Sequence, residues 1–376
     1  MKPIQMVDTK TQYLRIKEQI DTGIQAVLDS AAYINGKPVL DFGKNLSAYL
    51  NVKHTIPCAN GTDALQIAMM ALDLQPGDEV ITPSYTYIAT TEVVALLRLK
   101  PVFVDVEKDT FCIDPKAVEA AITPKTKAIV PVHLYGQTAN MEEIMRIAHK
   151  HSLYVIEDNA QAIGADYTFS DGSVKKAGTI GTIGATSFYP SKNLGAYGDG
   201  GAIFTNDDAL AEKLKMIANH GQKVRYYHEM VGCNSRLDSI QAAVLDVKLK
   251  YLDDYITARQ KAAAYYDNSF AGNEKITVPF VAAYTNHVYH QYTLILNGAD
   301  RDELSKYLAS QNVPSMIYYP VPAHRQNMFA GLGGNDYHLP VTDWLTERVI
   351  SLPIHTELDE EQLQHITSHV LNFINQ

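Results

Sequence analysis

The sequence has little cysteine, and its three cysteines form no pairs. Cys58, Cys112 and Cys233 are far apart in a chain of 376 residues, and no CxxC pair occurs. This spacing indicates neither a disulfide scaffold nor a thiolate zinc site, and it is typical of proteins in a reducing cytosol. The histidines that lack a metal-ligand partner at a recognisable spacing are His54, His133, His287 and His290. We therefore expect no metal site.

Positive charge and long apolar runs are also scarce. The chain has 32 Lys and Arg residues against 42 Asp and Glu residues, a formal net charge of -10. Nucleic-acid binding needs clustered basic residues, and here the basic residues are scattered among acids. The first 20 residues lack the apolar core of a signal peptide, and the run EVVALLRLKPVFVDV is interrupted by Arg98 and Lys100. We therefore expect a soluble cytoplasmic protein that binds neither nucleic acid nor membrane.

Between residue 55 and about residue 206, short β-rich runs alternate with runs of helical period. The predicted strands are EVITP (79–83), PVFVDV (101–106), AIVPVHL (128–134), LYVIED (153–158), ATSFY (185–189) and GAIFTN (201–206). The predicted helices between them are DALQIAMMAL, TEVVALLRL, DPKAVEAAI and MEEIMRIAHKH. This alternation predicts a doubly wound α/β domain with a mostly parallel sheet.

The pattern changes in the C-terminal part of the chain. Residues 236–266 contain no glycine or proline, and they predict one long helix that bridges two domains. The elements predicted after it are the strands HQYTLIL (290–296) and VPSMIYY (313–319) and the helices RDELSKYLASQ (301–311) and DEEQLQHITSHVLNFI (359–374). We expect a large α/β domain over residues 1–250, including an N-terminal helical segment, and a smaller α+β domain over residues 251–376.

Two polar segments lie where an open α/β sheet binds its ligands, beyond the carboxyl ends of strands. In ANGTDAL (59–65), Asn-Gly forms a turn, Thr62 or Asp63 is expected to cap the next helix, and the free N–H groups offer an anion site. In LYVIEDNAQAIGA (153–165), Asp158 ends a buried strand, where an acid meets a cation, a metal or a protonated ring nitrogen. Simple helix capping is the alternative for both segments.

A third segment, SFYPSKNLGAYGDGGA (187–202), places Lys192 just beyond a predicted strand. Its glycines follow the lysine, so it is no nucleoside-triphosphate loop, and it is no dinucleotide-binding turn followed by a helix. A lysine on a loop is commonly a solvated surface residue. Together, however, a lysine amine, a buried carboxylate 34 residues before it and a phosphate-ready helix start are the parts needed to hold pyridoxal 5'-phosphate.

Motifs along nearly the whole chain resemble those of the DegT/DnrJ/EryC1/StrS family of sugar-nucleotide aminotransferases. They are NGTDAL, GDEVITPSYTYIAT, PVFVDV, PVHLYGQ, VIEDNAQAIGA, TSFYPSKNLGAYGDGGAI and CNSRLDSIQAAVL. The resemblance implies the fold-type-I architecture of enzymes dependent on pyridoxal phosphate, with a large domain built on a seven-stranded type of sheet. Some relatives are dehydratases with histidine in place of the lysine, so Lys192 favours transamination.

The resemblance also implies a role for each matching residue. Lys192 corresponds to the lysine that forms the Schiff base and shuttles protons. Asp158 is implied to pair with the pyridine nitrogen, Gln161 with the ring hydroxyl, and Tyr87 to stack on the ring. The residues of the same chain that are assigned to the phosphate are Gly61, Thr62, Asp63 and Ser187. Asn234 of the partner subunit is implied to reach the same phosphate. The implied active unit is therefore a homodimer with shared active sites.

The reaction that the resemblance implies moves an amino group from an amino acid, expected to be L-glutamate, to a keto group of a dTDP- or UDP-linked sugar. Such a step serves amino-sugar and surface-polysaccharide biosynthesis. The segment YPVPAHRQ (319–326) favours a 3-keto over a 4-keto sugar. The candidate substrate contacts are Tyr189, His220, Lys223, Arg225, Tyr319, His324 and Arg325. A rigid packed loop around residue 320 and a solvated charged loop around residue 223 are the alternatives.

A role from another class stays open beside the enzymatic one. A protein of this fold can bind pyridoxal phosphate and act as a sensor or regulator without transaminase turnover. The chain carries no appended DNA-binding domain or basic helix, and every expected catalytic position is filled, which favours the enzyme.

Overall fold

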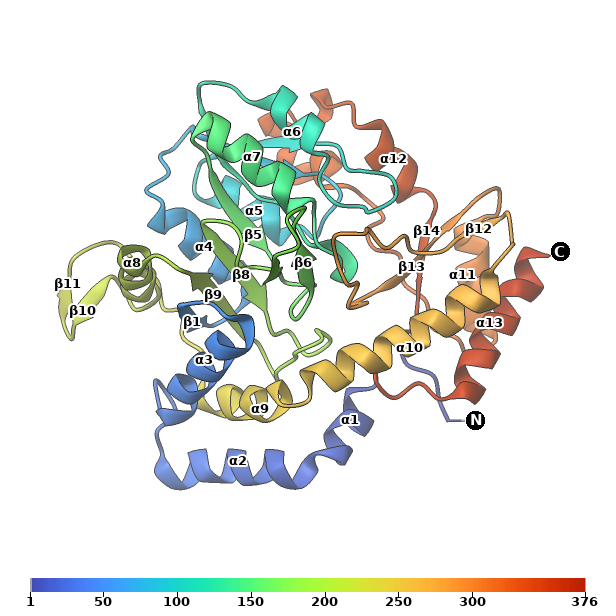
Figure 1. Ribbon diagram of the computed structural model, residues 1–376, viewed down its shortest axis with the longest axis horizontal. Helices are drawn as coiled ribbons and strands as arrows, with labels where there is room; N and C mark the ends of the chain where they lie inside the picture. Colours follow the sequence, from blue (N-terminus) through green and yellow to red (C-terminus); the bar gives the residue numbers. More distant parts are fainter. Residues whose placement is uncertain (1, 376) are drawn as a thin grey trace.

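A seven-stranded sheet forms the centre of the fold (Figure 1). In the computed structural model, which describes residues 2–375, the strand order is β1-β9-β8-β5-β4-β2-β3. The strands from β8 to β3 in this order are parallel, and β9 is antiparallel to both of its neighbours. The strands are β1 (His54–Cys58), β2 (Glu79–Pro83), β3 (Lys100–Val104), β4 (Thr126–Ile129), β5 (Tyr154–Asp158), β8 (Ile183–Ser187) and β9 (Gly201–Thr205). The predicted α/β class is confirmed, and each of the six predicted strands overlaps an observed strand.

Proline explains two differences between predicted and observed strands. The run 128–134 was expected to form one strand, but β4 ends at Ile129, two residues before Pro131, which has no N–H for a ladder hydrogen bond. β1 is missing from the predicted strands because its sequence HTIPC contains Pro57. That proline is tolerated because β1 lies at one edge of the sheet and pairs only with β9.

Alternate residues of the central strands pack into layers on opposite faces of the sheet. Val80 and Ile156 belong to the core under α4, α5 and α8, whereas Ile81 and Val155 belong to the core under α6 and α7. A third core joins α3 and α9 to β9. These helices are α3 (Lys37–Leu50), α4 (Gly61–Ala71), α5 (Ala89–Leu96), α6 (Pro115–Ala121), α7 (Met141–His151), α8 (Asp208–Ala218) and α9 (Ser239–Leu249). The four helices predicted between the strands are confirmed.

The single helix predicted over residues 236–266 is wrong, because two helices occupy this stretch. α9 ends at Leu249, and α10 (Leu252–Phe270) begins after a break at Lys250 and Tyr251. The N–H groups of these two residues donate to carbonyls three positions earlier, which tightens the last turn and ends α9. α1 (Thr9–Arg15) and α2 (Lys17–Ser30) precede the sheet, and α2 packs on α9 through Ile20 and Val244 (Figure 1).

A smaller antiparallel sheet follows, in the order β12-β13-β14, and shares a core with α10, α11 and α13. Its elements are β12 (Ile276–Thr277), β13 (Tyr292–Leu296), β14 (Val349–Leu352), α11 (Arg301–Ser310) and α13 (Glu360–Ile374). The predicted strand over 290–296 and both predicted helices are thereby confirmed. Ile4 lies in this core as well, so the segment around Ile4 packs against the C-terminal part of the chain.

The strand predicted over residues 313–319 is wrong. This segment makes only an isolated bridge from Met316 to Ser351, and β14 takes the place beside β13. The segment instead turns toward the large sheet, where Tyr318 and Tyr319 pack against the core that contains Tyr85. Its β-rich sequence therefore reflects packing of aromatic side chains between the two sheets.

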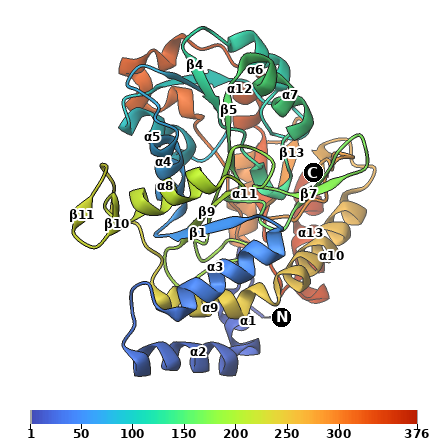
Figure 2. The ribbon, with the colours of Figure 1, turned by 60° about the vertical axis from the view of Figure 1, so that its left-hand side comes forward.

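The remaining elements lie in connections. They are β6 (Asp166–Thr168), β7 (Val174–Lys176), β10 (Gln222–Val224), β11 (Tyr227–His228), α12 (Pro340–Thr346) and the 3₁₀ turns Leu134–Gly136, Ala323–Arg325, Asn327–Leu332 and Gly334–Asp336. Strands β10 and β11 form a hairpin that stands away from the body of the molecule beside α8 (Figure 2). No helix within residues 2–375 combines the length and the apolar character needed to cross a bilayer.

Candidate active site

Lys192 lies in the loop that leaves β8 and returns as β9. The loop is closed by backbone hydrogen bonds from Ala196 N to Phe188 O at 2.8 Å and from Lys192 N to Tyr189 O at 2.8 Å. A Cβ atom on Gly195 would fall 2.3 Å from Pro190 O, so only glycine allows this close backbone approach. The expected place of Lys192, just beyond a strand of the main sheet, is confirmed.

Asp158 ends β5, the neighbour of β8, and the two strands pair in parallel with Asp158 opposite Ala185. The side chain is 6% exposed. Its Oδ2 accepts a hydrogen bond from Thr90 Oγ1 at 2.8 Å, and its Oδ1 accepts one from Ala160 N at 3.1 Å. No Lys or Arg within residues 2–375 forms an ion pair with it. A buried carboxylate with two neutral donors has capacity for a further, charged donor.

Glu157, next to Asp158, has a different environment. It is fully buried and accepts hydrogen bonds from the N–H groups of Gly178, Ile180 and Gly181 at 2.6 to 2.8 Å. His133 Nε2 also lies 2.8 Å from its Oε2. Because these partners saturate the carboxylate, Glu157 holds the loop before β8 and leaves Asp158 as the acid with a free acceptor site.

Gln161 joins the two parts of the chain. Its Oε1 accepts a hydrogen bond from Tyr135 N at 2.7 Å, and its Nε2 donates to the hydroxyl of Tyr319 at 2.9 Å. The ring of Tyr319 lies 6.1 Å from that of Tyr87, whose side chain is 57% exposed. The structure therefore brings Tyr319, predicted as a substrate contact, to the cofactor residues predicted from the sequence.

The start of α4 packs against the end of β8. Helix α4 begins at Gly61, and a Cβ atom there would lie 2.6 Å from Ser187 Cβ, so the backbone at Gly61 lies against Ser187. The predicted cap, Thr62 or Asp63, is wrong: Asn60 caps the helix, because it has an extended backbone and its Oδ1 accepts from Asp63 N at 2.8 Å. The first N–H groups of a helix lack internal partners, so this junction can hold an anion.

The residues predicted on the 220–234 segment do not join this group within one chain. His220, Lys223, Arg225 and Asn234 are all exposed, and none of them bonds to Lys192 in the described part of the chain. Lys223 lies 3.4 Å from Glu212, and the guanidinium of Arg225 lies 5.0 Å from the ring centre of Tyr226. Lys223 and Arg225 therefore contact neighbouring protein groups in the single chain.

His324 and Arg325 are bound to neighbouring protein groups. His324 is fully buried, with its Nδ1 2.6 Å from Ser84 Oγ, and Arg325 donates two hydrogen bonds to Asp343 at 2.9 and 2.6 Å. Burial lowers the pKa of His324, which favours the neutral imidazole. These contacts fix residues 321–326 against the end of β2. Tyr189, by contrast, is 56% exposed and one residue beyond Phe188 on the Lys192 loop.

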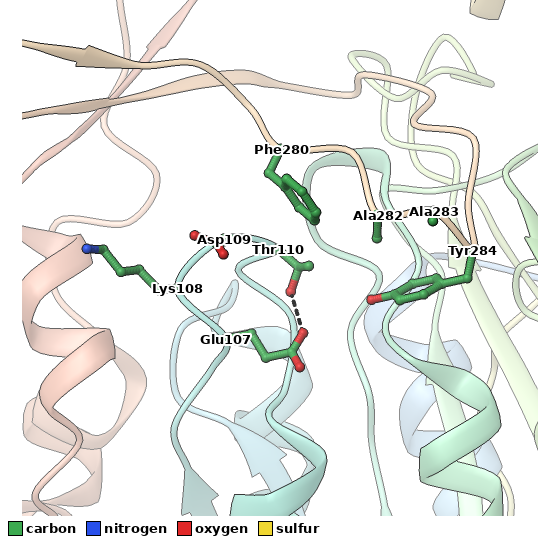
Figure 3. Close-up of a pocket in the computed structure, with 8 residues that line it drawn as sticks. All are labelled: Glu107, Lys108, Asp109, Thr110, Phe280, Ala282, Ala283 and Tyr284. Atoms are coloured by element: carbon green, nitrogen blue, oxygen red, sulfur yellow. Dashed lines mark hydrogen bonds between the residues drawn. The ribbon is translucent and has the colours of Figure 1, made fainter. Parts of the chain in front are cut away.

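Thr90, which donates to Asp158, is a site residue that the sequence did not predict. It lies in the first turn of α5, three residues after Tyr87, and this position after a strand end is the signal that could have identified it. A cavity of about 500 Å³, shown in Figure 3, is a separate feature that contains none of the predicted residues. Its lining is Glu107, Lys108, Asp109, Thr110, Phe280, Ala282, Ala283 and Tyr284.

The environment of Lys192 favours a reactive amine. Burial lowers its pKa to about 8, and the negative charge of Asp158 offsets part of this effect. A neutral amine is the nucleophile and the base, whereas an ammonium group is neither. The site can therefore form a bond to a carbonyl compound and move protons near neutral pH.

Acylation of Lys192 is expected to increase as the pH rises through about 8. Below that pKa the protonated amine does not react, and above it the neutral form predominates. The measurement is mass-spectrometric quantification of acetylated Lys192 after brief exposure of the cofactor-free chain to acetic anhydride between pH 6 and 11. A midpoint at about pH 10.4, the ordinary pKa of a lysine side chain, would contradict a lowered pKa of Lys192.

The chain is similar to a known family, to characterised relatives and to solved structures over nearly its whole length. Residues 14–371 match the DegT/DnrJ/EryC1/StrS aminotransferase family. A pleiotropic regulatory protein of Geobacillus stearothermophilus is 46% identical over 372 residues, 98% of this chain and 98% of the relative. A UDP-2-acetamido-2-deoxy-3-oxo-D-glucuronate aminotransferase of Pseudomonas aeruginosa is 47% identical over 369 residues, 98% of this chain and all of the relative. The crystal structure of S. venezuelae DesV with a ketimine intermediate has 39% identity and a TM-score of 0.95, with both chains fully covered.

Proposed function

Because this chain belongs to the DegT/DnrJ/EryC1/StrS aminotransferase family, we propose that it transfers an amino group from L-glutamate to a nucleotide-linked keto sugar. The observation that carries this proposal is that Asp158, a buried carboxylate, ends β5, while Lys192, an amine with lowered pKa, lies on the loop that follows the neighbouring strand β8. A reactive amine and a carboxylate with a free acceptor site are the two groups that amino transfer on pyridoxal phosphate needs.

The residues present fit pyridoxal phosphate. When bound, this group supplies an aldehyde that takes up amines and a ring that accepts electron density from a substrate carbon. The junction of Gly61, Thr62 and Ser187 offers backbone N–H and hydroxyl donors to a phosphate, supported by the positive end of α4. Asp158 offers its free acceptor site to a protonated ring nitrogen, and Gln161 lies three residues further on, beside Tyr319.

In the proposed reaction Lys192 transfers protons, and the residues around it hold the other groups of the site in place. Lys192 Nζ takes a proton from the substrate carbon and returns one in the second half of the reaction, which its lowered pKa allows near neutral pH. Thr90 orients the carboxylate of Asp158. The hydroxyl of Tyr319 accepts a hydrogen bond from the amide of Gln161. Tyr87, just before α5, and Tyr189, on the loop of Lys192, both have exposed aromatic rings.

The proposed acceptor is a UDP-linked 3-keto sugar. The relative from Pseudomonas aeruginosa acts on a UDP-linked 3-oxo sugar, and it matches this chain over its full length. The YPVPAHRQ segment, which favoured a 3-keto sugar in the sequence, is held in the structure by the contacts of Tyr319 with Gln161 and of His324 with Ser84. The product would be a 3-amino sugar nucleotide for polysaccharide biosynthesis.

We also propose a homodimer in which Asn234 of each chain completes the phosphate site of the other. The hairpin of β10 and β11 supports this arrangement, because Val224, Tyr226 and Tyr227 are 60 to 76% exposed on it. Large apolar side chains grouped on a projecting hairpin are commonly covered by a partner. His220, Lys223 and Arg225 on the same segment would then face the partner's sugar nucleotide. As in the sequence prediction, the two domains would meet near residue 250, and the enzyme would work in the cytoplasm.

A regulator that binds the cofactor without turnover is the second candidate, because one of the relatives is a regulatory protein. The test is addition of L-glutamate to the yellow, pyridoxal-phosphate-loaded protein, followed by absorbance and by analysis of 2-oxoglutarate. We expect loss of the yellow colour and one equivalent of 2-oxoglutarate per site. A protein that stays yellow with glutamate and with a panel of other amino acids would instead support the regulator.

A further inference from the structure

Helix α9 buries a lysine that the proposed chemistry does not use. The side chain of Lys248 is among the largest fully buried ones, and the residue is 1% exposed. No carboxylate within residues 2–375 forms an ion pair with it. Burial of an ammonium group is costly unless polar partners compensate, so a lysine in this place calls for a specific contact.

That contact is made with the loop of Lys192. Lys248 Nζ donates a hydrogen bond to Gly195 O at 2.6 Å and lies 5.2 Å from the ring centre of Tyr197. Gly195 is three residues beyond Lys192. The amine donates in its neutral form as well as in its protonated form, and the protonated form makes a hydrogen bond about twice as strong as the neutral one.

A second residue of α9 binds the same loop. Gln241 lies seven residues before Lys248, two helical turns away on the same face of the helix. Its Oε1 accepts a hydrogen bond from Tyr197 N at 2.8 Å, and its Nε2 donates to Tyr197 O at 3.4 Å. The helix therefore holds the returning half of the loop at two points.

The loop transmits this attachment to Lys192. Because a Cβ atom on Gly195 would lie 2.3 Å from Pro190 O, the returning strand of the loop runs directly against the segment that carries Lys192. Asn193 adds a third attachment, since its Nδ2 donates to Val288 O at 2.8 Å. A shift of Gly195 therefore has to move the backbone on both sides of Lys192.

We propose that Lys248 is a positioning residue for Lys192: it fixes the backbone of the reactive loop through Gly195 O without touching cofactor or substrate. The inference rests on the proposed function, because it assumes that the place of the Lys192 amine matters for amino transfer.

Stability does not account for a lysine at this position. Burial lowers the pKa of Lys248 to about 7, with a smaller contribution from the charge of Arg259. The unfolded chain therefore binds more protons than the folded chain between about pH 7 and roughly pH 10.4, the ordinary pKa of lysine. The buried amine thus opposes folding most strongly below about pH 7, and this cost disappears as the pH rises to roughly 10.4. An apolar side chain of similar length would avoid this cost.

The test compares K248M with the control K250M, which removes an exposed lysine two residues further along the chain. In the cofactor-free chain we expect K248M to speed amide hydrogen exchange in residues 193–198 by about tenfold, the scale of one lost hydrogen bond. The acylation profile of Lys192 should move to higher pH, because a loosened loop is better hydrated. The thermal midpoint should not fall, and K250M should match the wild type.

Unchanged exchange and an unchanged Lys192 profile in a folded K248M chain would overturn the proposal, whatever the thermal midpoint. K248Q, which keeps a neutral donor on a shorter side chain, is the second variant if K248M does not fold, and the same two readouts apply. Failure of both variants to fold would also overturn it, because Lys248 would then support the whole fold. Both readouts need no turnover, so a wild type without the glutamate half-reaction would refute only the proposed function.

Discussion

Replacement of Lys192 with alanine (K192A) is expected to lower the rate of the glutamate half-reaction by at least about 10³-fold, the scale seen when a nucleophile or base is removed. The variant loses the only amine on the reactive loop, the loop that closes through Ala196 N and Phe188 O. Stopped-flow absorbance of the cofactor-loaded protein mixed with glutamate measures this rate.

Two further variants separate the amine from the positive charge. K192R keeps the charge but remains protonated at any working pH, so we expect it to be as inactive as K192A. K175A removes an exposed lysine on β7 and should retain wild-type rates. More than a tenth of the wild-type rate in K192A would refute the assignment of Lys192.

Replacement of Asp158 with asparagine (D158N) is expected to lower the same rate by at least about 10²-fold, the cost of removing one preorganised electrostatic group from a site. The amide can still accept the hydrogen bond from Thr90, so the fold should survive. It has no negative charge with which to keep a ring nitrogen protonated. The measurements are the half-reaction rate and the thermal midpoint of the loaded protein.

D171N is the matched control, because Asp171 is an exposed acid in the turn between β6 and β7. We expect it to leave both quantities unchanged. A D158N protein with a normal rate would show that the free acceptor site of Asp158 has no part in the chemistry. A D158N protein with a low rate and a strongly lowered midpoint would show only that the carboxylate supports the fold.

The place of the site could be predicted from the sequence because it depends on local patterns. Asp158 and Lys192 each follow an apolar run of strand length, and the alternation with helices implies parallel strands. The carboxyl ends of such strands lie on one edge of the sheet, so the two residues were expected near each other. The structure shows the reason directly, since β5 and β8 are paired neighbours.

Other parts of the site depend on contacts that local patterns do not encode. Residues 313–319 are rich in β-formers, yet their aromatic side chains fill the space between two sheets, and this brings Tyr319 to Gln161. Residues 236–266 have helical composition throughout, and no glycine or proline marks the break at Lys250 and Tyr251, where Leu249 and Leu252 on either side pack into one core. Nothing in the sequence around Lys248 distinguishes it from a surface lysine, because its contact with Gly195 O forms only when α9 packs against the loop of Lys192.

The hairpin of β10 and β11 shows a further limit of prediction from one chain. Its basic residues are close in sequence and are predicted to form one anion site; in the single chain they are exposed, Lys223 lies beside Glu212, and Arg225 lies over the ring of Tyr226. Their proposed ligand lies in a partner subunit, and no pattern within a single chain defines that contact.

Transfer of ¹⁵N from labelled L-glutamate to a UDP-linked 3-keto sugar tests the central claim most directly. The acceptor is UDP-2-acetamido-2-deoxy-3-oxo-D-glucuronate, the substrate of the relative from Pseudomonas aeruginosa, and a UDP-linked 4-keto sugar is the comparison. We expect a product with ¹⁵N bonded to C3, seen by NMR, with the wild-type chain and not with K192A. No labelled sugar from the wild type, or label at C4 of the 4-keto sugar alone, would contradict it.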